Sequence, residues 1–148
     1  IIDDGRLVQV AAPQQILRCP ATPFVARFTR TRNLLPGRAE PAADGALVRI
    51  EGGPELRSTA RQSGPVIAAI RPESIALLGA GDNGPADNRF DATVRRCTPR
   101  LTHVELELDA GMPLIAHLAH AAAAPEIGSR VRVAVSPAAV WLLPVATA

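Results

Sequence analysis

The feature of this sequence that most restricts its fold is a pattern that occurs twice. Residues 66–78 read VIAAIRPESIALL and residues 131–143 read VRVAVSPAAVWLL, so that Pro72 and Pro137 fall at the same place in each copy. Each copy is a short apolar segment, a proline and a second short apolar segment, which is typical of β-strands joined at a bend. The repeat predicts two similar β units that pack together or interleave.

The two copies differ in charge at the bend. Arg71 and Glu73 flank the first proline, whereas Ser136 and Ala138 flank the second. An arginine–carboxylate pair forms charge-assisted hydrogen bonds and is suited to fixing a β unit against a neighbouring domain or a partner subunit. The alternative interpretation is an exposed loop ion pair, which contributes only about 0–1 kcal/mol.

Further β-type segments fill most of the chain in both halves. They cover residues 46–51, 55–60, 66–71, 74–78, 90–97, 103–109, 113–119, 130–136 and 139–143. Each half begins near an asparagine, Asn33 or Asn88, that opens a strand. In segment 103–109 apolar and acidic residues alternate, which predicts one buried face and one solvent-exposed face. Short strands at this spacing predict a mainly β protein, an antiparallel barrel or sandwich.

The first 30 residues have a different character. A turn at Asp4-Gly5 is followed by an alternating, strand-like segment that runs to Pro13. Pro13 and Pro23 each suit the first turn of a short helix, because a proline there loses no helical hydrogen bond. The segment has few partners for its apolar side chains, so we expect it to be the end of a larger domain.

The composition excludes several functions. All 16 basic residues are arginine, so the chain has neither the Gly-Lys-Ser/Thr of a phosphate-binding loop nor a lysine nucleophile. With a net charge of +2, three Phe and one Trp, it lacks the basic, aromatic surface typical of nucleic-acid-binding proteins. No apolar run reaches the roughly 18–20 residues of a membrane span. We expect a soluble, cytosolic chain.

Histidine and cysteine residues offer little further chemistry at this stage. His117 and His120 are three residues apart and His103 precedes them, but no acid or cysteine has a spacing that matches a metal site. No nucleophile–base pair follows from the sequence either, because such sites are defined in space. The sequence therefore predicts no metal site and no catalytic residues.

The order of several motifs gives a resemblance to a known family. The N-terminal quarter follows one family pattern at Asp4, Gly5, Val8, Gln9, Pro13, Pro20, Phe24, Val25, Ala26, Phe28, Asn33 and Gly37. The IRPESIALL stretch at 70–78 matches an Ile-Arg-Pro-Glu element, and residues 104–119 and 128–143 match the segments that follow it. Together they resemble the C-terminal part of the ATP-binding subunit of bacterial ABC importers, which ends in a TOBE domain.

The resemblance implies a division into two parts. Residues 1–30 would be the C-terminal remnant of an ABC nucleotide-binding domain, and residues 31–148 a TOBE domain. That domain is an OB-fold-like antiparallel β barrel, similar to molybdate-binding proteins, here with a short α-helical N-terminal extension. Its implied role is regulation and dimerisation of the ATP-binding subunit, by coupling the nucleotide-binding domain to a partner subunit or a regulatory ligand.

Partners, location and activity follow from the same resemblance. The partners would be the nucleotide-binding domain, a second copy of the subunit and, through the parent protein, the transmembrane permease subunits, with no nucleic acid. The location would be cytoplasmic, peripheral to the inner membrane. The Walker motifs, the LSGGQ element and the switch histidine lie upstream in such subunits and are absent here. We therefore expect no ATP hydrolysis by this chain, with ATP and Mg²⁺ bound in the missing nucleotide-binding domain.

The alternative function is binding or sensing of an oxyanion such as molybdate, tungstate or sulfate. The candidate residues for a ligand site or an interface are Arg71, Glu73, Ser74, Asn88 and Arg89. Arginine, serine and asparagine side chains supply the hydrogen-bond donors that an oxyanion needs. Oxyanion-sensing relatives carry a Thr and a Ser after the PLIA-like strand, where this chain has His117, Ala121 and Ala122.

Overall fold

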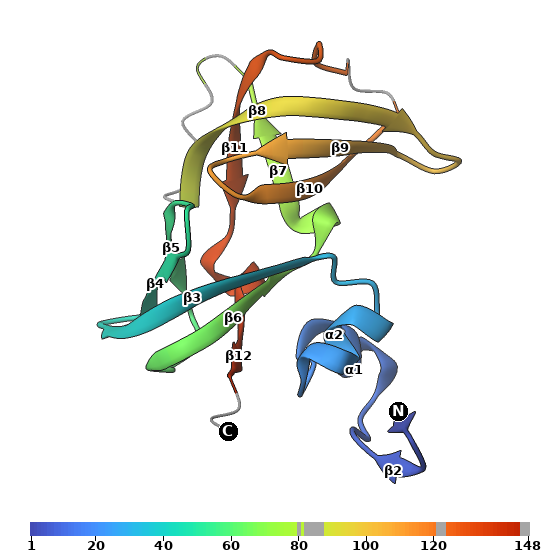
Figure 1. The fold of residues 1–148 in the computed structure, drawn as a ribbon, viewed down its shortest axis with the longest axis vertical. Helices are drawn as coiled ribbons and strands as arrows, with labels where there is room; N and C mark the ends of the chain where they lie inside the picture. Colours follow the sequence, from blue (N-terminus) through green and yellow to red (C-terminus); the bar gives the residue numbers. More distant parts are fainter. Residues whose placement is uncertain (80, 82–87, 121–123, 146–148) are drawn as a thin grey trace.

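Short β-strands make up most of the computed structural model, which describes residues 1–79, 81, 88–120 and 124–145 (Figure 1). The strands are β1 (Ile2–Asp3), β2 (Arg6–Leu7), β3 (Asn33–Ala42), β4 (Gly45–Ile50), β5 (Glu55–Ser58), β6 (Gly64–Ile70), β7 (Ile75–Leu78), β8 (Asn88–Pro99), β9 (Val104–Asp109), β10 (Pro113–Leu118), β11 (Arg130–Val135) and β12 (Trp141–Pro144). The helices are α1 (Pro13–Arg18) and α2 (Pro23–Phe28), with 3₁₀ turns η1 (Pro72–Ser74) and η2 (Pro137–Ala139). The predicted mainly β, antiparallel fold with a helical N-terminal extension is confirmed.

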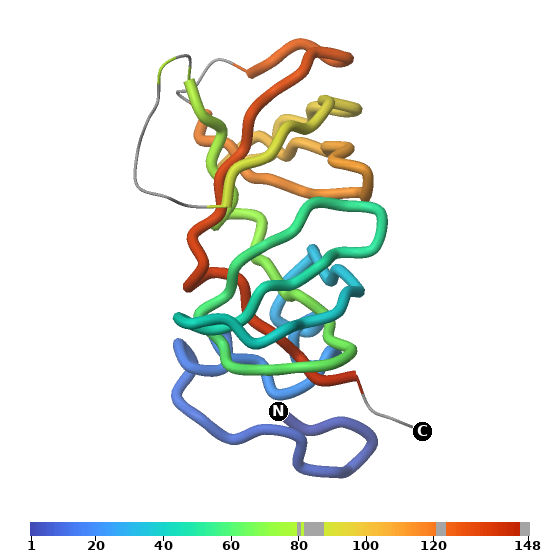
Figure 2. The backbone as a smooth tube through the Cα atoms, turned by 90° about the vertical axis from the view of Figure 1, so that its left-hand side faces the viewer, coloured from blue at the N-terminus to red at the C-terminus, as the bar shows by residue number. Residues whose placement is uncertain are grey.

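The large strands form two five-stranded antiparallel sheets of equivalent construction. One sheet has the order β12-β6-β3-β4-β5, and the other has the order β7-β11-β8-β9-β10. The chain therefore repeats the same four-strand path twice, and each unit then places its fifth strand in the sheet of the other unit. Figure 2 shows the C-terminal part of the chain running from the second unit back to the first.

This exchange of strands explains the repeat in the sequence. β7 pairs with β11, where Ile75 lies opposite Val135, and β12 pairs with β6, where Trp141 lies opposite Ala69. Of the two predicted arrangements, packing together or interleaving, the structure shows interleaving. The bend predicted at each of the two prolines is a 3₁₀ turn between two strands. Each proline begins its turn, because its fixed φ and missing N–H suit the first position of a helical turn.

The hydrophobic core lies between the two sheets and is supplied by both. Its largest fully buried side chains come from alternating positions, which put every second residue on the inner face. They are Val48, Leu56, Val66, Ile70, Val94, Leu106, Leu114, Val133, Val135 and Leu142. Burial of each such side chain contributes roughly 1.5–3 kcal/mol. The exchanged strands carry part of this core, so neither unit buries its apolar face without the other.

The N-terminal segment packs on the outer face of the first sheet. Ala26 of α2 is fully buried against Ala69 and Leu143, which lie on β6 and β12. Helices α1 and α2 begin at the predicted prolines, and the Thr22 hydroxyl caps α2 by accepting a hydrogen bond from Val25 N at 3.2 Å.

Two local predictions differ from the structure. The strand-like segment before α1 ends at Leu7, because the Val8 amide turns back to the Ile1 carbonyl and closes a small loop. Its turn is as predicted, since Asp4 and Gly5 both have positive φ, as a tight two-residue hairpin requires. Strand β3 runs through Pro36 and Pro41, which its alternation pattern does not predict. Among the described residues, no helix has the length and hydropathy of a bilayer span.

The two asparagines that open the halves tie the sheets together in the same way. Asn33 Nδ2 donates to the carbonyls of Ile70 and Ile115 at 3.1 and 2.8 Å, and its Oδ1 accepts from Ile115 N at 2.7 Å. Asn88 Oδ1 accepts from Arg57 N at 2.6 Å, and its Nδ2 donates to Arg57 O at 2.9 Å. Each buried amide thus joins its own sheet to an edge strand of the other sheet.

Loss of one of these amides is expected to weaken the whole fold. Asn33→Ala leaves backbone groups of Ile70 and Ile115 without their partner, so the free energy of unfolding should fall by about 2–3 kcal/mol. Urea denaturation measures this change. Glu40→Ala, an exposed position on the same strand, is the control and should change stability by less than about 0.5 kcal/mol. Equal losses in the two variants would show that the Asn33 amide does not join the sheets.

Candidate functional site

The five residues predicted to form a site lie in two places. Arg71 precedes the turn η1, and Glu73 and Ser74 belong to it. Asn88 and Arg89 lie at the start of β8. The Asn88 amide is directed to the backbone of β5, and Arg89 lies opposite Ala134 in the β8–β11 ladder. The structure therefore groups the first three residues and gives Asn88 a structural position in the sheet junction.

Arg71 joins the first bend to the N-terminal segment. Its Nε donates to Glu73 Oε1 at 2.6 Å, and its Nη1 donates to the carbonyls of Thr29 and Leu17 at 3.2 and 3.5 Å. Burial raises the pKa of Glu73, but the hydrogen bond from Arg71 and the positive charges nearby lower it by more than burial raises it. The pKa of Glu73 therefore lies below its ordinary value. The carboxylate is therefore ionised at neutral pH and holds the guanidinium in place.

Trp141 contacts the same segment from the second unit. Its Nε1 donates to the Pro20 carbonyl at 2.9 Å, and in the repeat this residue corresponds to Ala76. Between the helical segment and the two bends lies a cavity of about 240 Å³. Its lining includes Leu17, Pro20, Thr31, Thr59, Arg71, Ser74 and Trp141. The Thr31 hydroxyl is buried and has no hydrogen-bond partner among the described residues.

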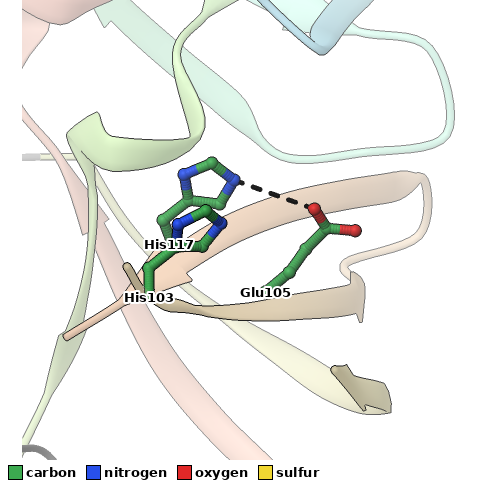
Figure 3. Close-up of side chains that lie close together, drawn as sticks. All are labelled: His103, Glu105 and His117. Atoms are coloured by element: carbon green, nitrogen blue, oxygen red, sulfur yellow. Dashed lines mark ion pairs between the residues drawn. The ribbon is translucent and has the colours of Figure 1, made fainter. Parts of the chain in front are cut away.

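A second polar cluster lies on the outer face of the β9–β10 hairpin (Figure 3). His103 immediately precedes β9 and Glu105 is its second residue, so the two side chains lie on one face, and His117 of β10 lies directly opposite Glu105. The two imidazole rings stack, with centroids 3.8 Å apart and an angle of 25° between their planes. Figure 3 shows both rings beside the Glu105 carboxylate, beneath the turn η1.

Glu105 is the electrostatic centre of this cluster. It is only 8% exposed, and its carboxylate lies 2.7 Å from Arg32 Nη1, 3.4 Å from Arg100 Nη2 and 3.9 Å from His117 Nε2. Burial raises the pKa of Glu105, but the Arg32 and Arg100 charges lower it by more, so the pKa lies below its ordinary value. Burial and the neighbouring His103 lower the pKa of His117, against the opposing effect of Glu73 and Glu105. The carboxylate is ionised and the imidazole neutral at pH 7.

This cluster corrects one prediction from the sequence. The acidic face of β9 is not uniformly solvent-exposed, because its first acidic residue, Glu105, is buried and paired with Arg32 and Arg100. The sequence showed no acidic residue at a spacing that matches a metal site, but the hairpin register places Glu105 beside His103 and His117. The alternation in β9 and the hairpin turn after it carry the signal for this cluster, because pairing of the two strands places His117 opposite Glu105. Ala121 and Ala122, where oxyanion-sensing relatives have hydroxyls, lie outside the described residues.

Comparison with known proteins places the chain in a family. The model of the TOBE domain family matches residues 68–143, just over half of the chain, and the chain belongs to this family. A solved structure of the cytoplasmic molybdate-binding protein ModG with molybdate bound has the same fold. It superposes with a TM-score of 0.64 at 18% sequence identity, over 76% of this chain and 96% of that one.

The curated relatives are ATP-binding proteins of importers. The spermidine/putrescine import ATP-binding protein PotA of Thermobifida fusca is 38% identical over 102 residues, which are 64% of this chain and 26% of that protein. The Fe(3+) ions import ATP-binding protein FbpC of Streptomyces coelicolor is 30% identical over 144 residues, 97% of this chain and 38% of that protein. The chain thus spans about a quarter to two fifths of the length of these relatives. The resemblance to ABC importer ATP-binding subunits is confirmed.

The buried ion pair at Glu105 should stabilise the fold measurably. Glu105→Gln removes the charge that Arg32 and Arg100 share, so the free energy of unfolding at pH 7 should fall by about 1–3 kcal/mol. Glu107→Gln on the same strand is the matched control, because Glu107 meets Arg96 at 3.1 Å in an exposed pair worth at most about 1 kcal/mol. Chemical denaturation of both variants checks the difference. A larger loss for Glu107→Gln would contradict the role of the covered pair.

Proposed function

We propose that this chain is the C-terminal part of the ATP-binding subunit of an ABC importer. Residues 1–30 would belong to the nucleotide-binding domain, and residues 31–148 would form its regulatory and dimerising TOBE domain. Membership of the TOBE family supports this assignment, as do relatives that are named import ATP-binding proteins and are matched over part of their length. The cargo of the importer is left open, because relatives with different named cargoes match this chain.

The observation that carries the proposal is a double contact between the β units and the N-terminal segment. Arg71 of the first bend and Trp141 after the second bend both donate to backbone carbonyls of that segment. Both residues break the symmetry of the repeat, since Ser136 and Ala76 occupy the equivalent positions. The packing of the two β units on each other does not require Arg71 and Trp141 to differ from their counterparts in the repeat. Their role is to fix the orientation of the nucleotide-binding domain on the barrel.

Exposed apolar side chains in the N-terminal segment support the same assignment. Ile2, Leu7, Val10, Leu17 and Phe28 are between 40% and 76% exposed. All five belong to the first 28 residues, the segment assigned to the nucleotide-binding domain. In the complete subunit, the body of the nucleotide-binding domain would cover them.

The chain itself would be non-enzymatic in this role. ATP and Mg²⁺ would bind to the remainder of the nucleotide-binding domain, and this part would transmit its movements to the barrel and to a second subunit. Such a subunit works at the cytoplasmic face of the inner membrane with permease subunits as partners and without nucleic acid. Purified alone, the chain should hydrolyse no ATP.

Removal of the Arg71 guanidinium should loosen the N-terminal segment without unfolding the barrel. In Arg71→Ala the segment loses two carbonyl contacts, and a cost of about 1 kcal/mol would make its opening roughly fivefold more frequent. Trp141 is the only tryptophan and the chain has no tyrosine, so its fluorescence reports on this contact alone. The expected result is a red-shifted emission and faster trypsin cleavage within residues 1–30. Arg61→Ala, an exposed arginine, is the control and should change neither.

The same variant tests the function in the complete ATP-binding subunit. Arg71→Ala should leave ATP binding intact while weakening dimerisation of the subunit and the transport that depends on it. Unchanged dimerisation together with unchanged transport would refute the regulatory role of this contact.

A second candidate function, oxyanion binding, is favoured by the cavity at the two bends. Arg71, Ser74 and Thr31 line it, and the buried hydroxyl of Thr31 has no hydrogen-bond partner within the described part of the chain. An arginine and two hydroxyl groups supply donors for a tetrahedral oxyanion, although Glu73 already shares the Arg71 charge.

Isothermal titration with molybdate, tungstate and sulfate tests this second candidate. If the cavity is the site, the chain should bind one of these anions saturably, and Ser74→Ala should weaken binding by about tenfold through loss of a hydrogen bond to a charged group. Thr31→Val should weaken it similarly while leaving the unliganded fold at least as stable, because the hydroxyl has no partner to lose. An absence of heat from all three anions with a folded chain would exclude the oxyanion function.

A further inference from the structure

We propose that His103, Glu105 and His117 form a binding site for a divalent transition-metal ion of the Zn²⁺ type. The site lies on the outer face of the β9–β10 hairpin, next to the turn η1, and uses none of the groups with which Arg71 and Trp141 contact the N-terminal segment. It is independent of the proposed transport function and holds whether or not the chain belongs to an importer.

The geometry of the three side chains is close to that of a metal site. One potential ligand atom from each residue lies within 4.8 Å of the others. Ligands at about 2.0–2.2 Å from a tetrahedral Zn²⁺ lie roughly 3.5 Å apart, so small side-chain rotations close the site. The backbone needs no change, because the paired strands β9 and β10 fix the relative positions of Glu105 and His117.

The unsatisfied imidazole nitrogens are the observation that points to a ligand. Nε2 of His103 and Nε2 of His117 are both buried, and neither has a hydrogen-bond partner among the residues that the structure describes. Buried polar atoms are nearly always paired, so two such nitrogens in one cluster require an explanation, and a bound ion supplies one. His103 Nδ1 lies 3.0 Å from the Thr102 hydroxyl. Metal-bound histidines commonly make this kind of outer hydrogen bond, which fixes the ring and leaves the other nitrogen for the metal.

The types of ligand at the site select the metal. Glu105 is the only carboxylate among the three ligands, and its other contacts are with Arg32 and Arg100. Mg²⁺ and Ca²⁺ prefer several oxygen ligands, whereas Zn²⁺, Co²⁺ and Ni²⁺ bind neutral imidazole well. Three protein ligands leave a fourth tetrahedral position for water or a partner group.

Titration of the chain with ZnCl₂ after removal of metals with EDTA tests the proposal. The expected result is saturable binding of one Zn²⁺ per chain, with no comparable binding of Mg²⁺ or Ca²⁺. His103→Ala and His117→Ala should each weaken binding by at least about tenfold, as the loss of a metal ligand does at other sites. His120→Ala is the matched control, because His120 lies outside the cluster and contacts the Leu101 carbonyl, and its affinity should be unchanged.

Two further measurements keep the result specific. Co²⁺ bound in place of Zn²⁺ should give the wild type the visible absorption of a tetrahedral site. This absorption should be absent in His103→Gln and His117→Gln. These variants keep a polar side chain at each position and serve in place of the alanine variants if those unfold. The molar mass measured by light scattering should stay the same when Zn²⁺ is added, because the ion binds within one chain and does not bridge two chains. Absence of saturable Zn²⁺ binding, or equal affinity of the wild type and both folded histidine variants, would overturn the proposal.

Discussion

The exchange of one strand between two equivalent β units is the constraint on which the rest of this structure depends. β7 and β12 each complete the sheet of the other unit, and both also supply core residues there. Because the exchanged strands follow the 3₁₀ turns at Pro72 and Pro137, the exchange brings both bends to the middle of the molecule. The buried amides of Asn33 and Asn88 hold the same junction with hydrogen bonds across the sheets.

Function on this scaffold depends on where the symmetry fails. The two bends have the same backbone course, so a side chain present in only one of them is free to serve a contact that the fold does not require. Arg71 and Trp141 use that freedom to hold backbone carbonyls of the N-terminal segment. Carbonyl acceptors fix the position of a helical segment without depending on its side chains, which suits a contact between a barrel and a larger domain.

Charge on the outer surface is organised by proximity rather than by sequence order. Arg32 follows α2, Glu105 belongs to β9 and His117 to β10, and their side chains meet next to η1. Burial makes the Glu105 carboxylate costly unless it is paired, which is why two arginines converge on it. The same convergence gives this end of the second sheet a polar cluster with chemistry that its strands alone do not indicate.

The sequence by itself determined the β units, their repeat, the helical N-terminal segment and the family, because apolar alternation, prolines at fixed positions and ordered motifs are local signals. It also singled out Arg71 and Glu73, because these two residues differ in charge from the residues at the equivalent positions of the second copy. Only the tertiary structure decided that the fifth strands are exchanged, that Asn88 is a structural clamp, and that Glu105 joins His103 and His117. Those facts depend on strand pairing and on residues such as Arg32 that are more than seventy positions away from Glu105. Alternation specifies which face a side chain occupies, but it does not specify what covers that face.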